Sequence, residues 1–403
     1  MDPTSFTERR TGELVPITEG GYAFVPSFLP PPTVFLTAPV FSALERATIE
    51  VGRLDGQSSD FPHPEVLQAP FMRREAVLSS RIEGTQTSYS ELVFFEAAAE
   101  EMDSGDDARE VSNYVAALQY GLSLATESNV SKRIICETHR LLMTGTSEES
   151  RSGKFRDEQV YIGSSGLPIS ESRFVPPPVI HLDSCFEDFV RYINSPDDLP
   201  LLVRLAIIHY QFEAIHPFFD GNGRIGRLII PLLLCHAGTI SKPMLYLSAY
   251  FESRRTEYND LMFRVSSDGR WADWITFFLN GIAAQARDSR QRMRQLQLLR
   301  GNYWGRIQSA RNAPALLKLI DALIELPIMS NARAQTILGQ TLQSSSSAVN
   351  RLVDVGVLAA MNVPGRAEFF VAREILEIID RAEAVPSADA ALFDDQKVPQ
   401  SPS

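Results

Sequence analysis

The sequence predicts a mainly α-helical protein with a short β-hairpin in its middle and a C-terminal winged helix-turn-helix domain. Apolar residues recur at helical spacing over most of the chain between residues 41 and 300. Residues 153–178 interrupt this pattern with a strand-like run, a turn and three prolines. Beyond residue 312, a helix, a short helix, a longer helix and two short strands are predicted in that order, which is typical of a winged helix.

The first part of the chain divides into an arm and a helical region. Residues 1–40 are rich in Pro and Gly, and we expect them to form an extended arm that lies over a folded body. Residues 41–110 form the N-terminal helical region, in which prolines up to Pro70 are expected to separate the first helix from a second helix at residues 71–82. Gly84 is placed to end that second helix.

Residues 111–300 are expected to form a helical core around the hairpin. The run Gln159–Gly163 predicts one strand, and Phe174-Val175 the returning strand. From the end of the N-terminal helical region through this core, helices are expected at residues 89–102, 108–126, 131–143, 183–194, 200–214, 223–237, 254–267 and 271–300.

The C-terminal part is predicted to contain one domain and a tail. In residues 312–382 we expect helices at 316–326, 330–337 and 341–355, followed by strands at 359–361 and 369–371. Residues 384–403 are rich in Ser, Pro and Asp with few apolar side chains, so we expect them to be disordered.

Composition narrows the class of protein. The 403 residues are 44% hydrophobic and carry a formal net charge of -12, which disfavours a general nucleic-acid binder. The three cysteines lie far apart without a CxxC pair, which is typical of reduced thiols. Because the sequence contains neither a signal peptide nor an 18-residue apolar run, we expect a cytoplasmic protein that does not enter a membrane.

The segment from His216 to Arg227 has the features of a phosphate site. Pro217 stops the preceding helix, and Gly221 and Gly223 allow successive backbone N–H groups to face one concavity. A helix begins immediately afterwards, and a helix N-terminus beside such a nest binds phosphate. A bare turn or a calcium loop is the alternative, but the carboxylates of a calcium loop do not follow Gly223.

Charged side chains complete this segment. Arg224 and Arg227 share one side of the first helical turns and can both bind phosphate oxygens. Asp220 is a hard oxygen ligand suited to Mg²⁺ beside a polyphosphate. His216 is of the residue type whose ordinary pKa suits a base for an attacking hydroxyl. Together these groups predict phosphoryl transfer.

Residues 216–227 resemble the full HxFx(D/E)GNGRxxR signature of the Fic family of protein AMP transferases. The resemblance implies a Fic-type helical core, with ATP as the substrate and Mg²⁺ as the cofactor. It implies that AMP is transferred to an exposed Ser, Thr or Tyr hydroxyl of a target protein, and of the chain itself. Other transferred groups, namely UMP, phosphocholine or phosphate, stay open as alternatives.

The same resemblance implies a role for each residue of the signature. His216 would be the catalytic base, Asp220 would hold Mg²⁺, and Arg227 would bind the γ-phosphate. The remaining ATP-binding positions would be Gly221, Asn222, Gly223, Arg224, Ile225 and Gly226, with Tyr258 lining the adenine pocket. Val160, Tyr161 and Ile162 resemble the flap strand that clamps the target by main-chain pairing.

Residues 79–84 match the (S/T)xxxE(G/N) inhibitory motif of Fic proteins. The resemblance implies that Glu83 pairs with Arg227 and displaces the γ-phosphate, with Ser79 as the other marked position of the motif. An alternative is that Glu83 orients water for the removal of AMP, which would make the protein a de-AMPylase or a bifunctional enzyme.

The predicted winged helix could serve DNA binding, protein contacts or a homodimer. Residues 314–381 hold six Lys or Arg against seven Asp or Glu, which is not the footprint of a DNA-binding domain. DNA binding is therefore not favoured, although a transcriptional regulator that senses nucleotide is the rival hypothesis for the whole protein.

Overall fold

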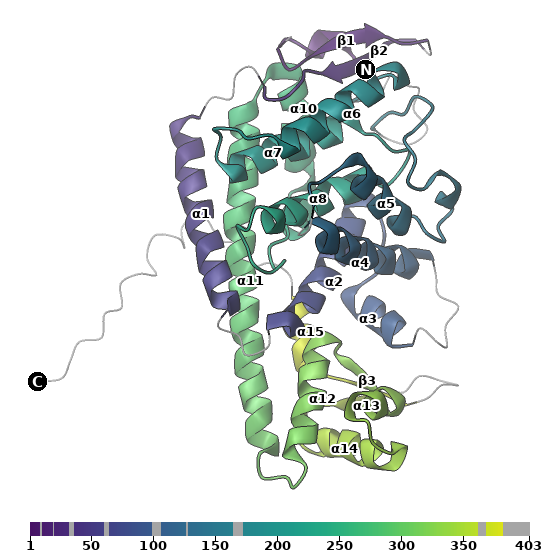
Figure 1. Cartoon of the computed structure of the whole chain (residues 1–403), viewed down its shortest axis with the longest axis vertical. Helices are drawn as coiled ribbons and strands as arrows, with labels where there is room; N and C mark the ends of the chain where they lie inside the picture. Colours follow the sequence, from purple (N-terminus) through teal and green to yellow (C-terminus); the bar gives the residue numbers. More distant parts are fainter. Residues whose placement is uncertain are drawn as a thin grey trace, which may run out of the picture.

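The computed structural model of the chain describes residues 1–8, 10–18, 20–31, 36–59, 64–98, 106–125, 128–163, 172–361 and 368–381. The protein is mainly helical, as the sequence predicts. Its longest axis follows α11 (Trp271–Ile307), a helix that extends along most of the molecule (Figure 1). α1 (Ala38–Ser59) packs along one part of α11. None of the described helices is long and apolar enough to cross a membrane.

The N-terminal arm is a β-hairpin rather than an extended segment. After a short 3-10 helix (Pro3–Ser5), β1 (Gly12–Pro16) pairs antiparallel with β2 (Tyr22–Pro26). Gly20 and Gly21, with φ of 89° and 97°, allow the tight turn between the strands. The hairpin lies over the core as expected, because the Phe24 N–H donates to the Val175 carbonyl.

The second helix is longer than the sequence predicts. α2 (Pro64–Glu83) continues through Pro70, which we expected to separate two elements. A proline inside a helix removes one backbone hydrogen bond, but its cost is offset where the helix is packed on several sides. α2 contacts α4, α8 and α9 of the core and α12 of the C-terminal part. Tertiary packing therefore outweighs the local preference.

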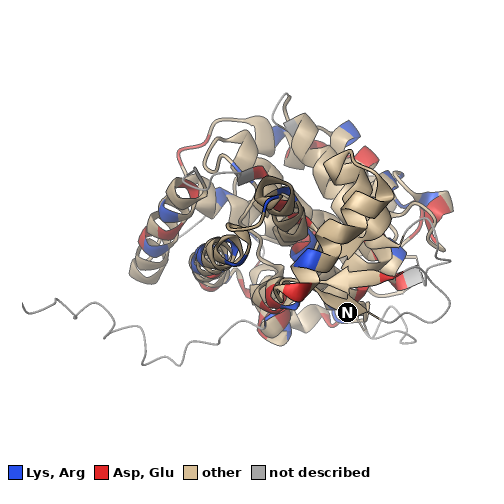
Figure 2. Cartoon of the chain, turned by 90° about the horizontal axis from the view of Figure 1, so that it is seen from below, with Lys and Arg blue, Asp and Glu red and all other residues tan. Residues whose placement is uncertain are grey.

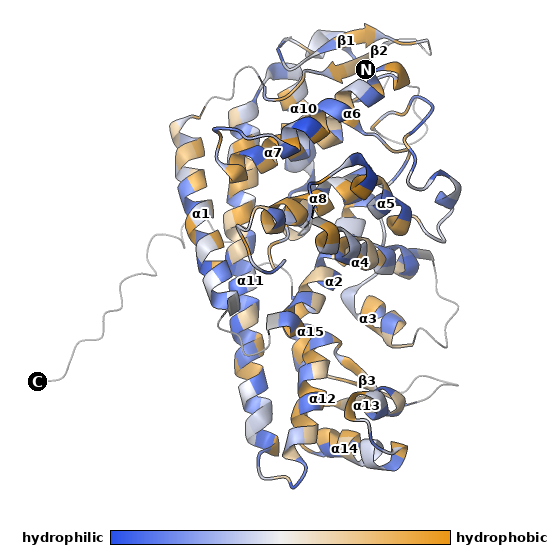
Figure 3. Cartoon of the chain, viewed as in Figure 1, coloured by the Kyte–Doolittle hydropathy of each residue, from blue (hydrophilic) through white to orange (hydrophobic). Residues whose placement is uncertain are grey.

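The other core helices pack around α7 and α8, and residues 216–227 span the junction between these two helices. α8 is apolar on nearly all sides and is buried between α7, α4 and α2. The bounds of the core helices are α3 (Tyr89–Ala97), α4 (Asp106–Ala125), α5 (Lys132–Leu142), α6 (Val179–Asn194), α7 (Leu201–Ile215), α8 (Asn222–His236), α9 (Ser248–Ser253) and α10 (Arg255–Asp268), with a 3-10 turn at Glu149–Arg151. Figure 3 shows apolar residues concentrated where these helices meet.

Among the described residues, the predicted central hairpin contains one antiparallel bridge, between Ile162 and Phe174. Its turn lies in residues 164–171, outside the described residues. The bridge still holds Ile162 beside the core, because the two residues exchange backbone hydrogen bonds of 2.8 and 3.2 Å.

Among its described residues, the C-terminal part contains every element that the sequence predicts there, together with the strand β3 and the helix α15, which the sequence pattern does not predict. The elements are α12 (Ala313–Glu325), β3 (Ile328–Ser330), α13 (Asn331–Leu338), α14 (Leu342–Asp354), β4 (Ala359–Met361), β5 (Phe369–Val371) and α15 (Arg373–Asp380). The strands pair antiparallel in the order β3-β5-β4. Identification of this unit as a winged helix stays a prediction, and the predicted disordered tail at 384–403 lies outside the described residues.

One buried arginine joins α15 of the C-terminal part to α11. Arg292 on α11 is fully buried, and its guanidinium donates to the backbone carbonyls of Ile378, Ile379 and Arg381 at the end of α15. Asp288 pairs with the same guanidinium at 2.7 Å. α15 also contacts α2, so the C-terminal part and the core share this helix.

Charged residues of both signs are interspersed along the described helices. In the view along the long axis, segments that carry Lys and Arg lie among segments that carry Asp and Glu (Figure 2). This distribution agrees with the acidic net charge of -12.

Candidate active site

The turn between α7 and α8 places His216 in an unusual backbone conformation. His216 caps α7 with φ of 51°, in the left-handed region that residues other than glycine rarely adopt. Arg156 holds this turn in place, because its Nε donates to the His216 carbonyl at 2.9 Å and its backbone N–H donates to the Pro217 carbonyl at 3.0 Å. Strain of this kind persists at functional sites where the surroundings over-determine it.

The loop after His216 is closed by its own side chains and by one distant histidine. The amide of Asn222 accepts from the Phe218 N–H and donates to the Phe218 carbonyl, both at 2.8 Å. His139 accepts from the Gly153 N–H at Nδ1, so its Nε2 carries the proton and donates to the Asp220 carbonyl at 2.9 Å. The Asn222 side chain is thus engaged within the loop, and Gly221, with φ of 76°, begins α8.

His216 has the protonation state that a base requires. Burial lowers its pKa to about 4, and the nearby guanidinium of Arg156 acts in the same direction. The ring is therefore neutral at pH 7. Its Nδ1 atom is buried and has no hydrogen-bond partner among the described residues. A neutral imidazole at the wall of a cavity is able to accept the proton of an incoming hydroxyl.

Arg224 and Asp220 form an ion pair with each other. Nη2 of Arg224 lies 3.0 Å from Oδ2 of Asp220, and its Nη1 lies 2.9 Å from Oε2 of Glu110. The Asp220 side chain is half exposed at 52%, so its carboxylate remains open to a ligand. The described residues contain no cluster of three or more His, Cys, Asp or Glu that would form a metal site by themselves.

Arg227 is bound by the end of α2. Nε of Arg227 donates to the Ser79 hydroxyl at 2.8 Å, and Nη2 donates to the Ser79 carbonyl at 3.0 Å and to Oε1 of Glu83 at 2.5 Å. Although burial disfavours the charged form of Glu83, Arg227 holds the pKa of this carboxyl below its usual value. Glu83 also covers the start of α8, since a Cβ at Gly223 would lie 2.2 Å from its Oε1.

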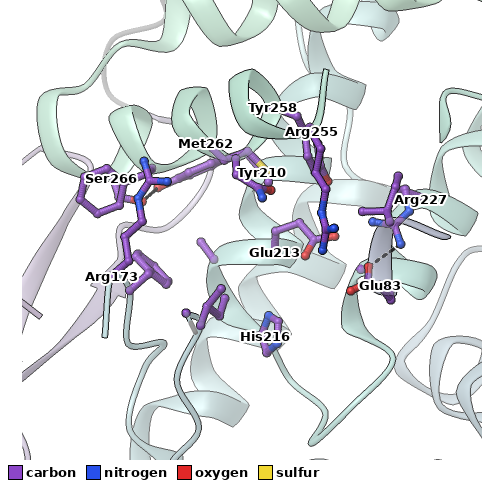
Figure 4. A pocket seen from close by; sticks show the side chains of 18 residues that line it. Glu83, Arg173, Tyr210, Glu213, His216, Arg227, Arg255, Tyr258, Met262 and Ser266 are labelled. Atoms are coloured by element: carbon purple, nitrogen blue, oxygen red, sulfur yellow. Dashed lines mark hydrogen bonds and ion pairs between the residues drawn. The ribbon is translucent and has the colours of Figure 1, made fainter. Parts of the chain in front are cut away.

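His216, Arg227 and Glu83 border a cavity of about 500 Å³, which is within the range of small-molecule sites (Figure 4). Of the sequence-predicted site residues, the cavity lining includes Glu83, Ile162, His216, Gly223, Arg227 and Tyr258. It does not include Ser79, Val160, Tyr161, Asp220, Gly221, Asn222, Arg224, Ile225 or Gly226. Ile225 is a fully buried core residue, and Gly226 lies against Glu213, which would collide with a Cβ there.

Tyr258 reaches the cavity but is largely a core residue. Its side chain is buried, its ring stacks on Phe251 with centroids 4.5 Å apart, and its hydroxyl is 2.8 Å from Nε2 of His209. Only an edge of the ring is therefore left for a ligand.

Sequence reasoning missed three residues that shape the site. His139 and Arg156 hold the loop, and Glu213 lines the cavity one helical turn before His216. Only a tertiary structure identifies His139 and Arg156, because their partners lie 81 and 60 residues away. A helical spacing argument would have placed Glu213 beside His216.

Two family models match the chain. The model described as "Fic/DOC family N-terminal" matches residues 41–123, and the model described as "Fic/DOC family" matches residues 129–234. These matches include α2 and the α7–α8 segment, the two parts that meet at Arg227.

Curated relatives are similar over the same region. A Drosophila yakuba protein named "Protein adenylyltransferase Fic" is 33% identical over 136 residues, which are 33% of this chain and 26% of that protein. A Caenorhabditis elegans protein named "Protein adenylyltransferase fic-1" is 33% identical over 106 residues, or 26% of this chain and 19% of that protein. The chain thus spans about a quarter or less of the length of these relatives.

A solved structure shares the fold over most of the chain. The crystal structure of a Fic family protein from Desulfovibrio desulfuricans G20 superposes with a TM-score of 0.57 and 18% sequence identity. The match covers 85% of this chain and 98% of that one, so the fold extends well beyond the segments that the family models match.

Proposed function

From the membership of this chain in the Fic/DOC family, we propose that it is a protein adenylyltransferase that transfers AMP from ATP to a hydroxyl of a target protein. The observation that carries this proposal is the convergence of His216, Gly223 and Arg227 on one cavity. A general base, a helix N-terminus and a guanidinium at one site are the groups that nucleotidyl transfer needs.

The proposed reaction is a single displacement at the α-phosphorus. The target hydroxyl oxygen forms a bond to that phosphorus, its proton passes to the ring of His216, and the bond to the β-phosphate oxygen breaks so that diphosphate leaves. His216 is suited to this step because it is neutral at pH 7 and lies at the cavity wall.

Asp220 is the residue that would hold Mg²⁺. The ion binds proteins through one or two carboxylates and completes its octahedron with substrate phosphates and water, which agrees with a single half-exposed carboxylate here. A bound Mg²⁺ would neutralise charge on the phosphates. Arg224 would keep the carboxylate oriented from α8.

The flap would present the target. Tyr161 and Ile162 are each 38% exposed although they are large apolar residues, and Ile162 also lines the cavity. We infer that Val160, Tyr161 and Ile162 pair with an extended target segment, whose hydroxyl side chain then reaches His216.

Glu83 would restrain the reaction. Its carboxylate occupies the guanidinium that the γ-phosphate of ATP needs, so bound ATP would not reach the geometry for in-line attack. In this proposal, the resting enzyme is autoinhibited by α2.

The test of the activity is transfer from α-labelled ATP with Mg²⁺, with the Glu83→Gly chain as the enzyme. We expect an adduct with the mass of one AMP unit on the chain or on an added protein, and none with Glu83→Gly/His216→Ala. His236→Ala in the same background is the matched control, because His236 is exposed at the far end of α8. An adduct that persists without His216 contradicts its role, and an adduct of another mass identifies a different transferred group.

A further inference from the structure

Glu213 is a carboxyl group of the cavity to which the proposed reaction assigns no role. It lies on α7, one helical turn before His216, and both residues line the cavity. Its Oε1 is buried and has no hydrogen-bond partner among the described residues. Oε1 is pressed against α8, where an added Cβ at Gly226 would lie 2.3 Å from it.

A comparison with Glu75 shows that Glu213 lacks the hydrogen bonds that satisfy another buried carboxyl of this protein. Both carboxyls have a pKa raised to about 7 by burial. Glu75 is satisfied within the protein, because the Ser248 hydroxyl donates to it at 2.5 Å and the Ser248 N–H and Tyr114 hydroxyl also donate. Among the described residues, no donor reaches Oε1 of Glu213, and a buried polar atom without a partner is rare enough to call for a ligand, water or ion that would satisfy it.

The position of Glu213 along the cavity indicates what it would contact. His216, Gly223 and Arg227 are the lining residues that would bind phosphates, and Tyr210, Met262 and Phe263 form an apolar region of the same lining. In Figure 4, Glu213 lies between His216 and the residues of that apolar region that the figure labels. In a nucleotide, the group between the phosphates and the base is the sugar.

We propose that Glu213 binds the ribose hydroxyls of the nucleotide and selects ribonucleotides over deoxyribonucleotides. Asp and Glu are the usual acceptors for ribose hydroxyls in nucleotide sites. A nucleotide that lacks the hydroxyl leaves the carboxyl unpaired in the cavity, and sites built to bind a hydroxyl discriminate strongly against its absence. This inference rests on the proposed function, since it assumes that the cavity holds a nucleotide.

The experiment compares ATP with 2′-deoxyATP and 3′-deoxyATP in the Glu83→Gly background. We expect kcat/KM for ATP to exceed that for at least one analogue by about tenfold or more, mainly through KM. Glu213→Ala should lower kcat/KM for ATP to that for the disfavoured analogue. It should leave kcat/KM for that analogue nearly unchanged. Glu213→Gln keeps an acceptor and should retain part of the preference. Glu137→Ala, at a partly exposed glutamate on α5 that does not line the cavity, is the matched control and should keep the full preference.

Two outcomes overturn the proposal: a parent chain that uses all three nucleotides equally, or a Glu213→Ala chain that keeps the full preference. Calorimetric binding of ATP and the two analogues gives a second readout that needs no transfer. If the chain binds ATP in preference to an analogue through Glu213 but transfers no AMP, the proposed activity fails while the ribose contact stands. An unchanged unfolding midpoint shows that the substituted chains are folded.

Discussion

Oε1 of Glu83, the last residue of α2, lies 2.5 Å from Nη2 of Arg227 on α8. The two residues are 144 positions apart in the chain, and Ser79 contacts the same guanidinium through its hydroxyl and its carbonyl. The guanidinium is buried, with 2% of the Arg227 side chain exposed. A phosphate that binds Arg227 must therefore replace a carboxylate that is already in place.

Removal of this carboxylate should activate the protein. We expect Glu83→Gly to raise the rate of AMP transfer at least about tenfold, the scale of an ordinary coupling free energy. Glu83→Gln keeps the shape but loses the charge, and it should give a smaller increase. Transfer is measured with α-labelled ATP, and Glu137→Gly serves as a control outside the site. An unchanged rate of AMP transfer in Glu83→Gly would contradict the inhibitory role of Glu83.

Acid should destabilise the protein partly through His209. Its side chain is buried, Nε2 lies 2.8 Å from the Tyr258 hydroxyl, and burial lowers its pKa to about 3. Between pH 6.5 and that value the unfolded chain binds a proton that the folded chain does not, so stability falls as pH decreases. From pH 7.5 to 5.5 this group should cost about 1.4 kcal/mol.

The comparison of His209→Gln with the parent isolates this effect. Denaturant unfolding at the two pH values should show that the variant lacks this part of the loss, whereas His236→Gln should behave as the parent does. The pH dependence must be compared between parent and variant because Glu75 and Glu213 make the free energy of unfolding change with pH in the opposite direction. Their pKa of about 7 means that the stability they contribute below the unfolded carboxyl pKa is lost as pH rises through 7. Equal pH dependence in parent and His209→Gln would refute the assignment.

Loss of Arg292 should detach α15 from the core. Arg292→Met removes the donors to three backbone carbonyls and leaves Asp288 without its 2.7 Å partner. We expect the free energy of unfolding to fall by about 3 kcal/mol, and amide exchange in residues 373–380 to accelerate. Arg294→Met, an exposed position on the same helix, should change stability by less than about 0.5 kcal/mol. Slow exchange in α15 of the Arg292 variant would contradict this role.

The C-terminal part should not retain DNA at physiological salt. Arg351 is the one basic side chain of α14, and Arg333 on α13 is used within the protein, where it donates to the Ala322, Leu326 and Ile328 carbonyls. Binding to a phosphate backbone needs several available cations. We expect no retarded fragment in a gel-shift assay, and retardation that weakens steeply with salt would instead support the transcriptional regulator.

The sequence by itself determined the parts of this protein that depend on neighbouring residues. Pro217 and Gly221 act through steric limits on a few backbone angles, so the end of α7 and the start of α8 follow from their positions. The Ser330 and Thr341 caps determine the starts of α13 and α14 in the same way. The residue pattern also predicted a phosphate site, and the resemblance added the pairing of Glu83 with Arg227.

Only the tertiary structure decided the features that depend on distant groups. Pro70 remains inside α2 because neighbours on several sides outweigh a local hydrogen bond, and Arg292 is buried because α15 supplies carbonyls from 86 or more residues away. Glu213 is an ordinary helical glutamate in the sequence. It acquires a pKa near 7 and a place in the cavity because α8 approaches it at Gly226. Burial and desolvation act between elements that fold together, and no short window of sequence contains both partners.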